Sequence, residues 1–208
     1  VNADGTPWYS AEPWNVFRLS SKSHWDVPVD TPHGTLHFLV SHPTPPVFDG
    51  PEDRNGRRNH DKIRFWGEYV WNRGNTWIVD DLGLRGGLQE NQRFVIAGDL
   101  NADPADGDGI PGTIVDLLEN PMVLRITTPR SEGAVEAALA DGGANLAHRG
   151  AHNHDTGSFG PKVGNLRLDY VLPSVGWQVL SKGVFWPKRG DTGSDWLDAT
   201  DHRMVWMD

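Results

Sequence analysis

Four segments of this chain place a carboxylate, an amide or an imidazole inside a short apolar run or at its end. The most informative is the apolar run at residues 94–97, which Gly98 ends and which Asp99 and Asn101 follow. Such a run is typical of a buried strand, and side chains two positions apart in an extended chain point to the same side. A carboxylate and an amide at the mouth of a buried strand can hold a metal-bound water or a phosphate oxygen. On this segment alone, a strand that simply ends in a polar turn is the commoner arrangement.

Two further segments are predicted strands that carry one polar group each. Residues 35–41 alternate apolar and polar side chains, and His42 follows them just before prolines that cannot continue a sheet. Residues 165–173 also alternate, and Asp169 falls on the face opposite the large apolar side chains. A charged side chain within such a strand is costly to bury unless it is paired.

The fourth segment is a C-terminal strand predicted at residues 201–208, which begins with Asp201 and His202. One polar group at a strand end is ordinary, but four such segments predict that the strand ends converge on one edge of a sheet. The groups have the chemistry of metal-assisted phosphoryl transfer. Carboxylates bind hard divalent cations, a histidine with a carboxylate behind it takes a proton from water, and further donors stabilise charge on phosphate oxygens.

The rest of the pattern predicts the elements that must position these groups. Strand signals in residues 14–29 and 35–41, on either side of a Pro-His-Gly turn, predict a hairpin. Residues 59–71 predict a helix with Asn59 as its N-cap. The other predicted elements are a helix at 113–119, a helix at 131–139 with Ser131 as its N-cap, and a strand at 177–186.

Composition indicates one folded domain over residues 1–208. The net charge of −9 argues against tight, non-specific nucleic-acid binding, but it does not exclude a nuclease, because a bound cation supplies positive charge locally. Cysteine is absent, which excludes disulfides and thiolate metal sites. No apolar run is long enough to span a membrane. The Trp-, Gly- and Pro-rich composition suggests an extracellular or periplasmic protein.

Taken together, the four segments resemble the endonuclease/exonuclease/phosphatase superfamily, whose members include deoxyribonucleases, abasic-site endonucleases, bacterial sphingomyelinases and inositol polyphosphate phosphatases. The matching motifs, in the family's order and approximate spacing, are Ser41-His42-Pro43, Gly98-Asp99-Leu100-Asn101-Ala102-Asp103, Arg167-Leu168-Asp169-Tyr170-Val171-Leu172 and Thr200-Asp201-His202-Arg203. The resemblance implies an α/β (α+β) fold, a four-layer sandwich of two mixed β-sheets flanked by helices. It also implies a phosphoesterase that uses Mg²⁺, or else Mn²⁺ or Ca²⁺, and a phosphate-ester substrate.

The resemblance further implies the roles of the C-terminal motifs. His202 is the expected general base that activates the attacking water. Asp169 is its expected orienting partner, which would explain a carboxylate within an apolar strand. Asp201 is an expected metal ligand.

The roles of the upstream residues follow from the same resemblance. Asp99 and Asn101 are expected to position the nucleophile, the phosphate or a second metal ion, and His42 is expected to contact the phosphate or to assist the leaving group. Arg57 and Arg58, in a polar loop predicted at residues 49–60, are candidates for holding phosphate groups. Salt bridges within that loop are the more ordinary use of these arginines.

One part of the family pattern is not found. The family carries a metal-binding Glu on a strand that precedes the motif at His42, whereas Glu12 of this chain lies in a proline-bounded loop. The chain therefore resembles the C-terminal half to two-thirds of the family domain. We expect the remainder to be a removed segment or a separate chain, or the apolar face that it leaves exposed to be covered in a homo-oligomer.

Other interpretations stay open. The ten Trp residues and the Asp/Gly-rich loops also fit a non-catalytic extracellular binding module, which predicts an exposed row of Trp and no clustering of the acidic and histidine residues. The Trp positions in predicted strands and in the helix favour core packing instead. An inactive family member is the third interpretation. For an enzyme, phosphodiesters and phosphomonoesters both remain open, with a small or lipid-linked phosphate preferred over long DNA.

Overall fold

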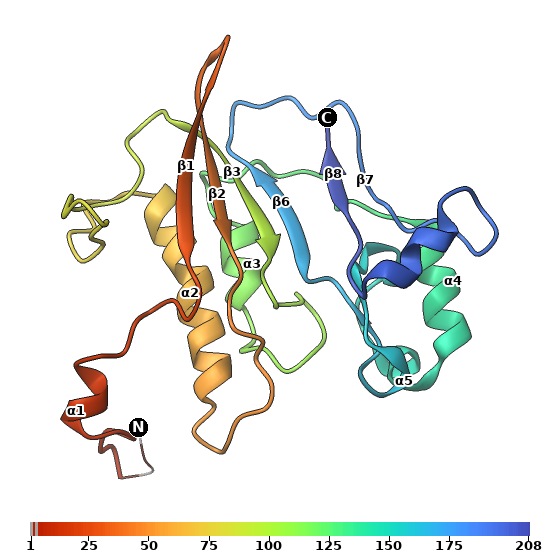
Figure 1. Ribbon diagram of the computed structural model, residues 1–208, viewed down its shortest axis with the longest axis horizontal. Coiled ribbons are helices and arrows are strands. Elements are labelled where there is room, and N and C mark those ends of the chain that lie inside the picture. The colour runs from red at the N-terminus through yellow and green to blue at the C-terminus, as the bar shows by residue number, and fades with distance from the viewer. Residues whose placement is uncertain (1, 3) are drawn as a thin grey trace.

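Apolar alternation builds a mixed four-stranded sheet at the centre of the molecule (Figure 1). Its strands, in spatial order, are β1 (His24–Thr31), β2 (Gly34–Ser41), β3 (Arg93–Asp99) and β6 (Asp169–Pro173). β1 and β2 form an antiparallel hairpin, β2 runs parallel to β3, and β3 runs antiparallel to β6. Two shorter antiparallel pairs join β4 (Gly157–Ser158) to β5 (Asn165–Leu166) and β7 (Lys182–Val184) to β8 (Val205–Met207).

This computed structural model describes residues 2 and 4–208. Its helices are α1 (Ala11–Trp14), α2 (Arg54–Val70), α3 (Thr113–Leu118), α4 (Glu132–Asp141) and α5 (Gly160–Val163), with 3₁₀ turns η1 (Gly143–Ala147), η2 (His152–His154) and η3 (Ser194–Ala199). The predicted α/β class, with several sheets and flanking helices, is confirmed; the four-stranded sheet is mixed, and the other two are antiparallel pairs. Within the described part of the chain, no helix combines the length and the apolar character needed to cross a membrane.

Several predicted elements are present with different limits. α2 begins at Arg54, so Asn59 is a buried residue of the helix interior and the prediction that it caps the helix was wrong. The strand predicted at 165–173 is interrupted between β5 and β6, because the Thr156 hydroxyl accepts the N–H groups of Leu168 and Asp169. The hairpin, the helix α3 and the helix α4 are confirmed. Ser131 caps α4 by accepting a hydrogen bond from Ala134 N at 3.3 Å.

Extended structure is also shorter than predicted at three places, one of which is β8, where only Val205–Met207 of the strand predicted at 201–208 is extended. β1 begins only at His24, although the sequence pattern predicts strand structure from residue 14 onward. β7 covers only Lys182–Val184 of the strand predicted at 177–186, since its partner β8 offers three residues for pairing.

One face of the four-stranded sheet carries the main core. The register aligns Leu39, Ile96 and Leu172 on this face. α2 and α3 cover it, with Ile63 and Trp66 of α2 almost fully buried against the strands. Burial of a side chain of this size contributes roughly 1.5–3 kcal/mol each, so this layer supplies much of the folding free energy.

The opposite face of the sheet is open. Trp25, Val27 and Val29 alternate onto it from β1, and Phe38 of β2 lies opposite Val27. Their exposed fractions are 60%, 40%, 42% and 39%, respectively. Large contiguous apolar surface in contact with water promotes association.

We expect the chain, as given, to self-associate through this open face. Size-exclusion chromatography with light scattering should show a mass that rises with protein concentration. Replacing both Trp25 and Phe38 by Lys should shift the population towards monomer. Leu146→Lys is the control, because Leu146 is 77% exposed but lies in η1, outside the sheet. A wild-type chain that stays monomeric at all concentrations would contradict the expectation.

A partly buried histidine, His24, joins the sheet to α2. Its ring centroid lies 4.7 Å from that of Phe65 and 5.0 Å from that of Trp66. Its Nε2–H donates to the backbone oxygen of Lys62 at 3.0 Å. Burial lowers the pKa of His24 from about 6.5 to about 4, and the Lys62 ammonium adds to this, while the hydrogen bond to the carbonyl opposes it.

The depressed pKa predicts a loss of stability in acid. Between its folded and unfolded pKa values, His24 binds a proton only in the unfolded chain, so its contribution is present above about pH 6.5 and is lost as the pH falls towards about 4. We expect the free energy of unfolding to fall by about 2 kcal/mol between about pH 7 and about pH 5 on this account. Urea titrations should show a clearly smaller fall in His24→Gln, which keeps a donor for Lys62 O. His33→Gln, in the exposed hairpin turn, should behave as wild type.

Candidate active site

The pairing of β3 with β6 sets two carboxylates side by side. Asp99 lies opposite Asp169 in the register. Tyr170, the next residue along β6, is buried in the helical layer, so the two carboxylates lie on the open face, as predicted for Asp169. Gly98 permits this arrangement: its φ is +143°, and a Cβ there would lie 2.4 Å from Ser41 O.

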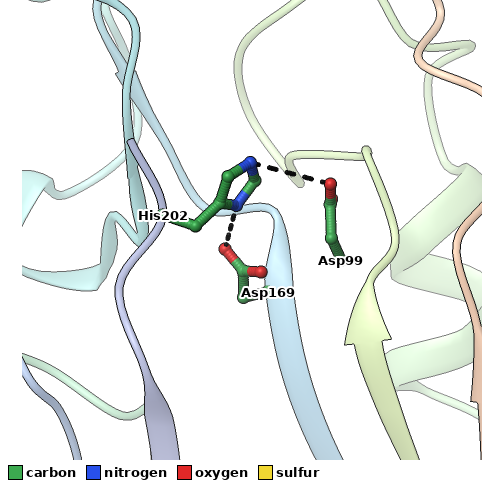
Figure 2. A group of neighbouring side chains, drawn as sticks. All are labelled: Asp99, Asp169 and His202. Carbon is green, nitrogen blue, oxygen red and sulfur yellow. Dashed lines mark hydrogen bonds and ion pairs between the residues drawn. The ribbon is translucent and has the colours of Figure 1, made fainter. Parts of the chain in front are cut away.

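His202 reaches these carboxylates from the segment before β8. An isolated backbone bridge pairs it with Gly157. Its ring lies between Asp169 and Asp99 (Figure 2), with Nδ1 2.9 Å from Asp169 Oδ2 and Nε2 3.8 Å from Asp99 Oδ2. Nε2 therefore faces the other carboxylate without a hydrogen bond to it.

The contact with Asp169 decides the tautomer of His202. An ionised carboxylate only accepts hydrogen bonds, so Nδ1 carries the hydrogen and Nε2 of the neutral ring keeps its lone pair. Thr156 Oγ1 donates to the same Asp169 Oδ2 at 2.8 Å. Thr156, which is buried, thus orients the Asp169 carboxylate, and Asp169 in turn orients the His202 ring.

Burial and charge shift the pKa values of the cluster. Burial alone would lower the pKa of His202, but the hydrogen bond and charge of Asp169, with the charges of Asp99 and Asp201, raise it above its ordinary value. Burial raises the pKa of Asp99, against the hydrogen bond from Asn101 N, and the charge of Asp169 raises it further. A positive charge between the two carboxylates would favour their ionised forms.

Asn101 and His42 complete the surroundings of Asp99. Asn101 has a φ of +51°, in the left-handed region that Asn tolerates, so a turn and not strand alternation brings it back to Asp99. Its backbone N donates to Asp99 Oδ1 at 2.8 Å, and its Nδ2 donates to Asp99 Oδ2 at 3.1 Å. His42 Nε2 lies 3.2 Å from the same Oδ2.

The half-exposed ring of His42 has a lowered pKa. Burial is the main cause, and the charges of Lys22 and His202 lower it further, while Asp99 opposes them. The structure therefore brings five of the predicted residues together. They are His42, Asp99, Asn101, Asp169 and His202.

Asn59 of α2 holds the two loops of the site together. Its Nδ2 donates to Thr44 O at 2.9 Å, to Leu100 O at 3.0 Å and to Asn101 O at 3.1 Å. The first of these carbonyls follows His42 and the other two follow Asp99, so one buried amide ties both loops to the helix. The sequence predicts Asn59 as a helix cap, and its contacts with both loops are not evident from the sequence pattern.

Lys62 and Trp66 lie on the same side of α2 as Asn59. Lys62 is fully buried, and its Nζ contacts Ser21 Oγ and Thr44 Oγ1. Trp66 Nε1 donates to Ser41 Oγ at 2.7 Å, directly before His42. The sequence feature that could have indicated a buried Lys62 is its position one residue before Ile63, on the apolar side of an amphipathic helix.

Three predicted residues lie outside the cluster. The Asp201 carboxylate is exposed and accepts only a 3.5 Å contact from Thr200 Oγ1 among the described residues. Arg57 Nε donates to Glu52 O at 3.0 Å, and Arg58 Nη2 donates to Arg18 O at 3.2 Å. Their proposed roles in binding metal and phosphate stay predictions.

The chemistry of the cluster fits a divalent cation. One ligand atom each of Asp99, Asp169 and His202 lies within 4.8 Å of the others. Hard cations prefer carboxylate oxygens, and His202 Nδ1 is already bound to Asp169. Asp99 and Asp169 are therefore the residues that would hold an ion, with the Asn101 amide oxygen as a further oxygen donor nearby.

The fold and this site agree with the family comparison. The family model described as Endonuclease/Exonuclease/phosphatase family matches residues 5–202. The chain belongs to this family.

Solved structures with similarity to the chain come from bacterial proteins. They include beta toxin 275-280 from Staphylococcus aureus (15% identity, TM-score 0.43, covering 87% of this chain and 51% of that one), its F277A, P278A mutant with bound magnesium ions (11%, 0.41, 87% and 52%) and sphingomyelinase C from Streptomyces griseocarneus (12%, 0.38, 88% and 52%). The chain thus spans about half the length of these proteins. No curated protein sequence matched it.

The contacts of Asn59 predict a large effect of its removal. Asn59→Ala leaves buried carbonyls of both site loops without a donor, which should lower the free energy of unfolding by about 3 kcal/mol. Asn55→Ala is the matched control, because Asn55 lies one turn earlier in α2, is partly exposed and donates to one carbonyl, Val47 O. Urea unfolding should show a clearly smaller loss for the control. Equal losses in the two variants would remove the special role of Asn59.

Proposed function

We propose that this chain is part of a divalent-metal-dependent phosphoesterase and that residues 1–208 belong to a single domain of that enzyme. The observation that carries the proposal is the His202 ring between two carboxylates, with Nδ1 bound to Asp169 and Nε2 directed into the site. Family membership supports the same reaction class. Phosphodiesters and phosphomonoesters are both consistent with the site.

The geometry supports direct attack by water. His202 Nε2 accepts a proton from the attacking water as its oxygen forms a bond to phosphorus. The bond from phosphorus to the ester oxygen breaks, and its electron pair leaves with that oxygen, which takes up a proton to become an alcohol. Asp169 keeps the ring oriented and stabilises the imidazolium that forms.

The remaining residues serve the phosphate. Asp99 and Asp169 would hold the cation, which supplies positive charge to the phosphate oxygens when bound. Asn101 orients Asp99, and His42 directs a ring nitrogen into the same space. A general base of this kind contributes about 10²–10⁴-fold to the rate.

The binding-module alternative receives mixed support. Trp66 and Trp186 are buried, but Trp25, Trp71 and Trp206 are exposed by 37% or more, so the expectation that most Trp residues pack in the core was wrong. The convergence of Asp99, Asp169 and His202 is the feature that a module without chemistry does not need. We therefore propose an enzyme and not a binding module.

The test is hydrolysis of bis-(nitrophenyl) phosphate and nitrophenyl phosphate with Mg²⁺ or Mn²⁺. It should use this chain and a version with any residues that precede it in its gene restored. We expect turnover that a chelator abolishes and added metal restores. His202→Ala should lower kcat by at least about 100-fold while the circular-dichroism spectrum and the unfolding midpoint change little.

His33→Gln is the control for this variant, since His33 lies in the exposed hairpin turn. Wild-type turnover in His202→Ala would refute the role of this residue. Absence of turnover in both versions of the protein, with the fold intact, would favour an inactive member or one restricted to another substrate.

A further inference from the structure

His42 has a cationic partner behind its ring, unlike His202. Lys22 Nζ lies 2.9 Å from His42 Nδ1. An ammonium group has three donors and no acceptor. Nδ1 must therefore accept this hydrogen bond, and the hydrogen of the neutral ring must be on Nε2.

The other side of the ring agrees with this assignment. His42 Nε2 lies 3.2 Å from Asp99 Oδ2, a carboxylate oxygen that accepts hydrogen bonds. This contact is an ion-pair distance and not a hydrogen bond, so the hydrogen bond with Lys22 alone selects the tautomer. The nearby acceptor is consistent with a hydrogen on Nε2, which is directed into the site.

We infer that Lys22 is a positioning residue that fixes His42 as a hydrogen-bond donor opposite His202, the hydrogen-bond acceptor. The two histidines flank Asp99, but they are held in opposite tautomers by opposite charges. Asp169 holds the hydrogen of His202 on Nδ1. Lys22 holds the hydrogen of His42 on Nε2.

The catalytic meaning of this inference rests on the proposed function. In that reaction, His202 takes one proton from the attacking water. The Nε2–H of the neutral His42 ring can donate a hydrogen bond to the phosphate or to the ester oxygen that leaves phosphorus, and that oxygen takes its proton from solvent. The His202 imidazolium returns its proton to solvent, so the protons balance, with a proton acceptor on one side of Asp99 and a hydrogen-bond donor on the other.

A second layer holds Lys22 in place. Lys22 is exposed, so its long side chain would lose rotamer freedom on forming a contact by itself. Lys62, which is fully buried, contacts the hydroxyls of Ser21 and Thr44, which lie 3.0 Å from each other. These two residues flank the contact, since Ser21 precedes Lys22 and Thr44 follows His42 by two positions. The contacts of Lys62 with these two hydroxyls therefore hold the two segments side by side.

The charged groups around His42 act in two directions. Lys22 and His202 disfavour a positive charge on its ring, whereas Asp99 and Asp169 favour one. The position of the hydrogen on the neutral ring follows from donor and acceptor geometry and does not depend on the balance of these charges.

The test is a histidine ¹⁵N NMR experiment on the full chain, at about pH 8, where an ordinary histidine is neutral. Ring nitrogens with and without hydrogen have well-separated ¹⁵N shifts, so the spectrum reports each tautomer directly. We expect His42 to be protonated on Nε2 and His202 on Nδ1. Spectra of His42→Gln and His202→Gln assign the signals.

Two substitutions at Lys22 separate positioning from simple structural support. Lys22→Met removes the donor but keeps the length of the side chain, and it should lower the ratio of Nε2–H to Nδ1–H tautomer at His42 by about fivefold, as expected for loss of one hydrogen bond. Lys22→Arg keeps a cationic donor and should retain the wild-type tautomer. Lys188→Met, at an exposed lysine before η3, should leave the spectrum unchanged.

The outcomes discriminate between this inference and the proposed function. A wild-type His42 protonated on Nδ1, or a Lys22→Met spectrum identical to wild type, would overturn the role of Lys22 whether or not the protein turns over substrate. The expected spectra without hydrolysis of either nitrophenyl ester would leave the role of Lys22 standing and count against the proposed function alone. If the protein turns over substrate, Lys22→Met should lower kcat by about five- to tenfold and change KM less than this. Lys22→Arg should retain most of the wild-type kcat.

Discussion

The register between β3 and β6 is the constraint on which the site depends. It places Asp99 opposite Asp169 on the open face of the sheet, where two like charges are unfavourable unless other groups share their field. His202 binds one carboxylate, and Asn101 and His42 contact the other. A slip of β6 by one residue would turn Asp169 to the helix-covered face while Asp99 stayed on the open face, so the same pairing that builds the core also fixes the geometry of the site.

Helix α2 couples the core to this geometry. Ile63 and Trp66 pack into the sheet, while Asn59 and Lys62 on the same side of the helix reach the loops that follow β2 and β3. Buried polar groups with several partners restrict a structure to one arrangement. The site loops are therefore positioned by a helix that also packs into the main core, and the exposed apolar face adjoins the site from the other side.

Opposite charges behind similar rings give the site its asymmetry. A carboxylate supports His202 and an ammonium supports His42, so chemically identical side chains present a lone pair on one side of Asp99 and a hydrogen on the other. This division of roles comes from the partners of the rings and not from the residue type. The residue types alone therefore do not specify which histidine donates a hydrogen bond and which accepts one.

The sequence by itself determined the α/β class, the hairpin, the helices α3 and α4, and the segments that carry His42, Asp99, Asp169 and His202, because each is a local signal of alternation, capping or strand ending. It did not determine the full length of α2, the breaks in the later strands or the exposure of several Trp residues. Only the tertiary structure decided that Asn59 bridges two loops, that Lys22 lies behind His42 and that Asp201 lies outside the cluster. These contacts join residues far apart in the chain, and they depend on strand register and on the rotation of α2 about its axis, which local patterns do not specify.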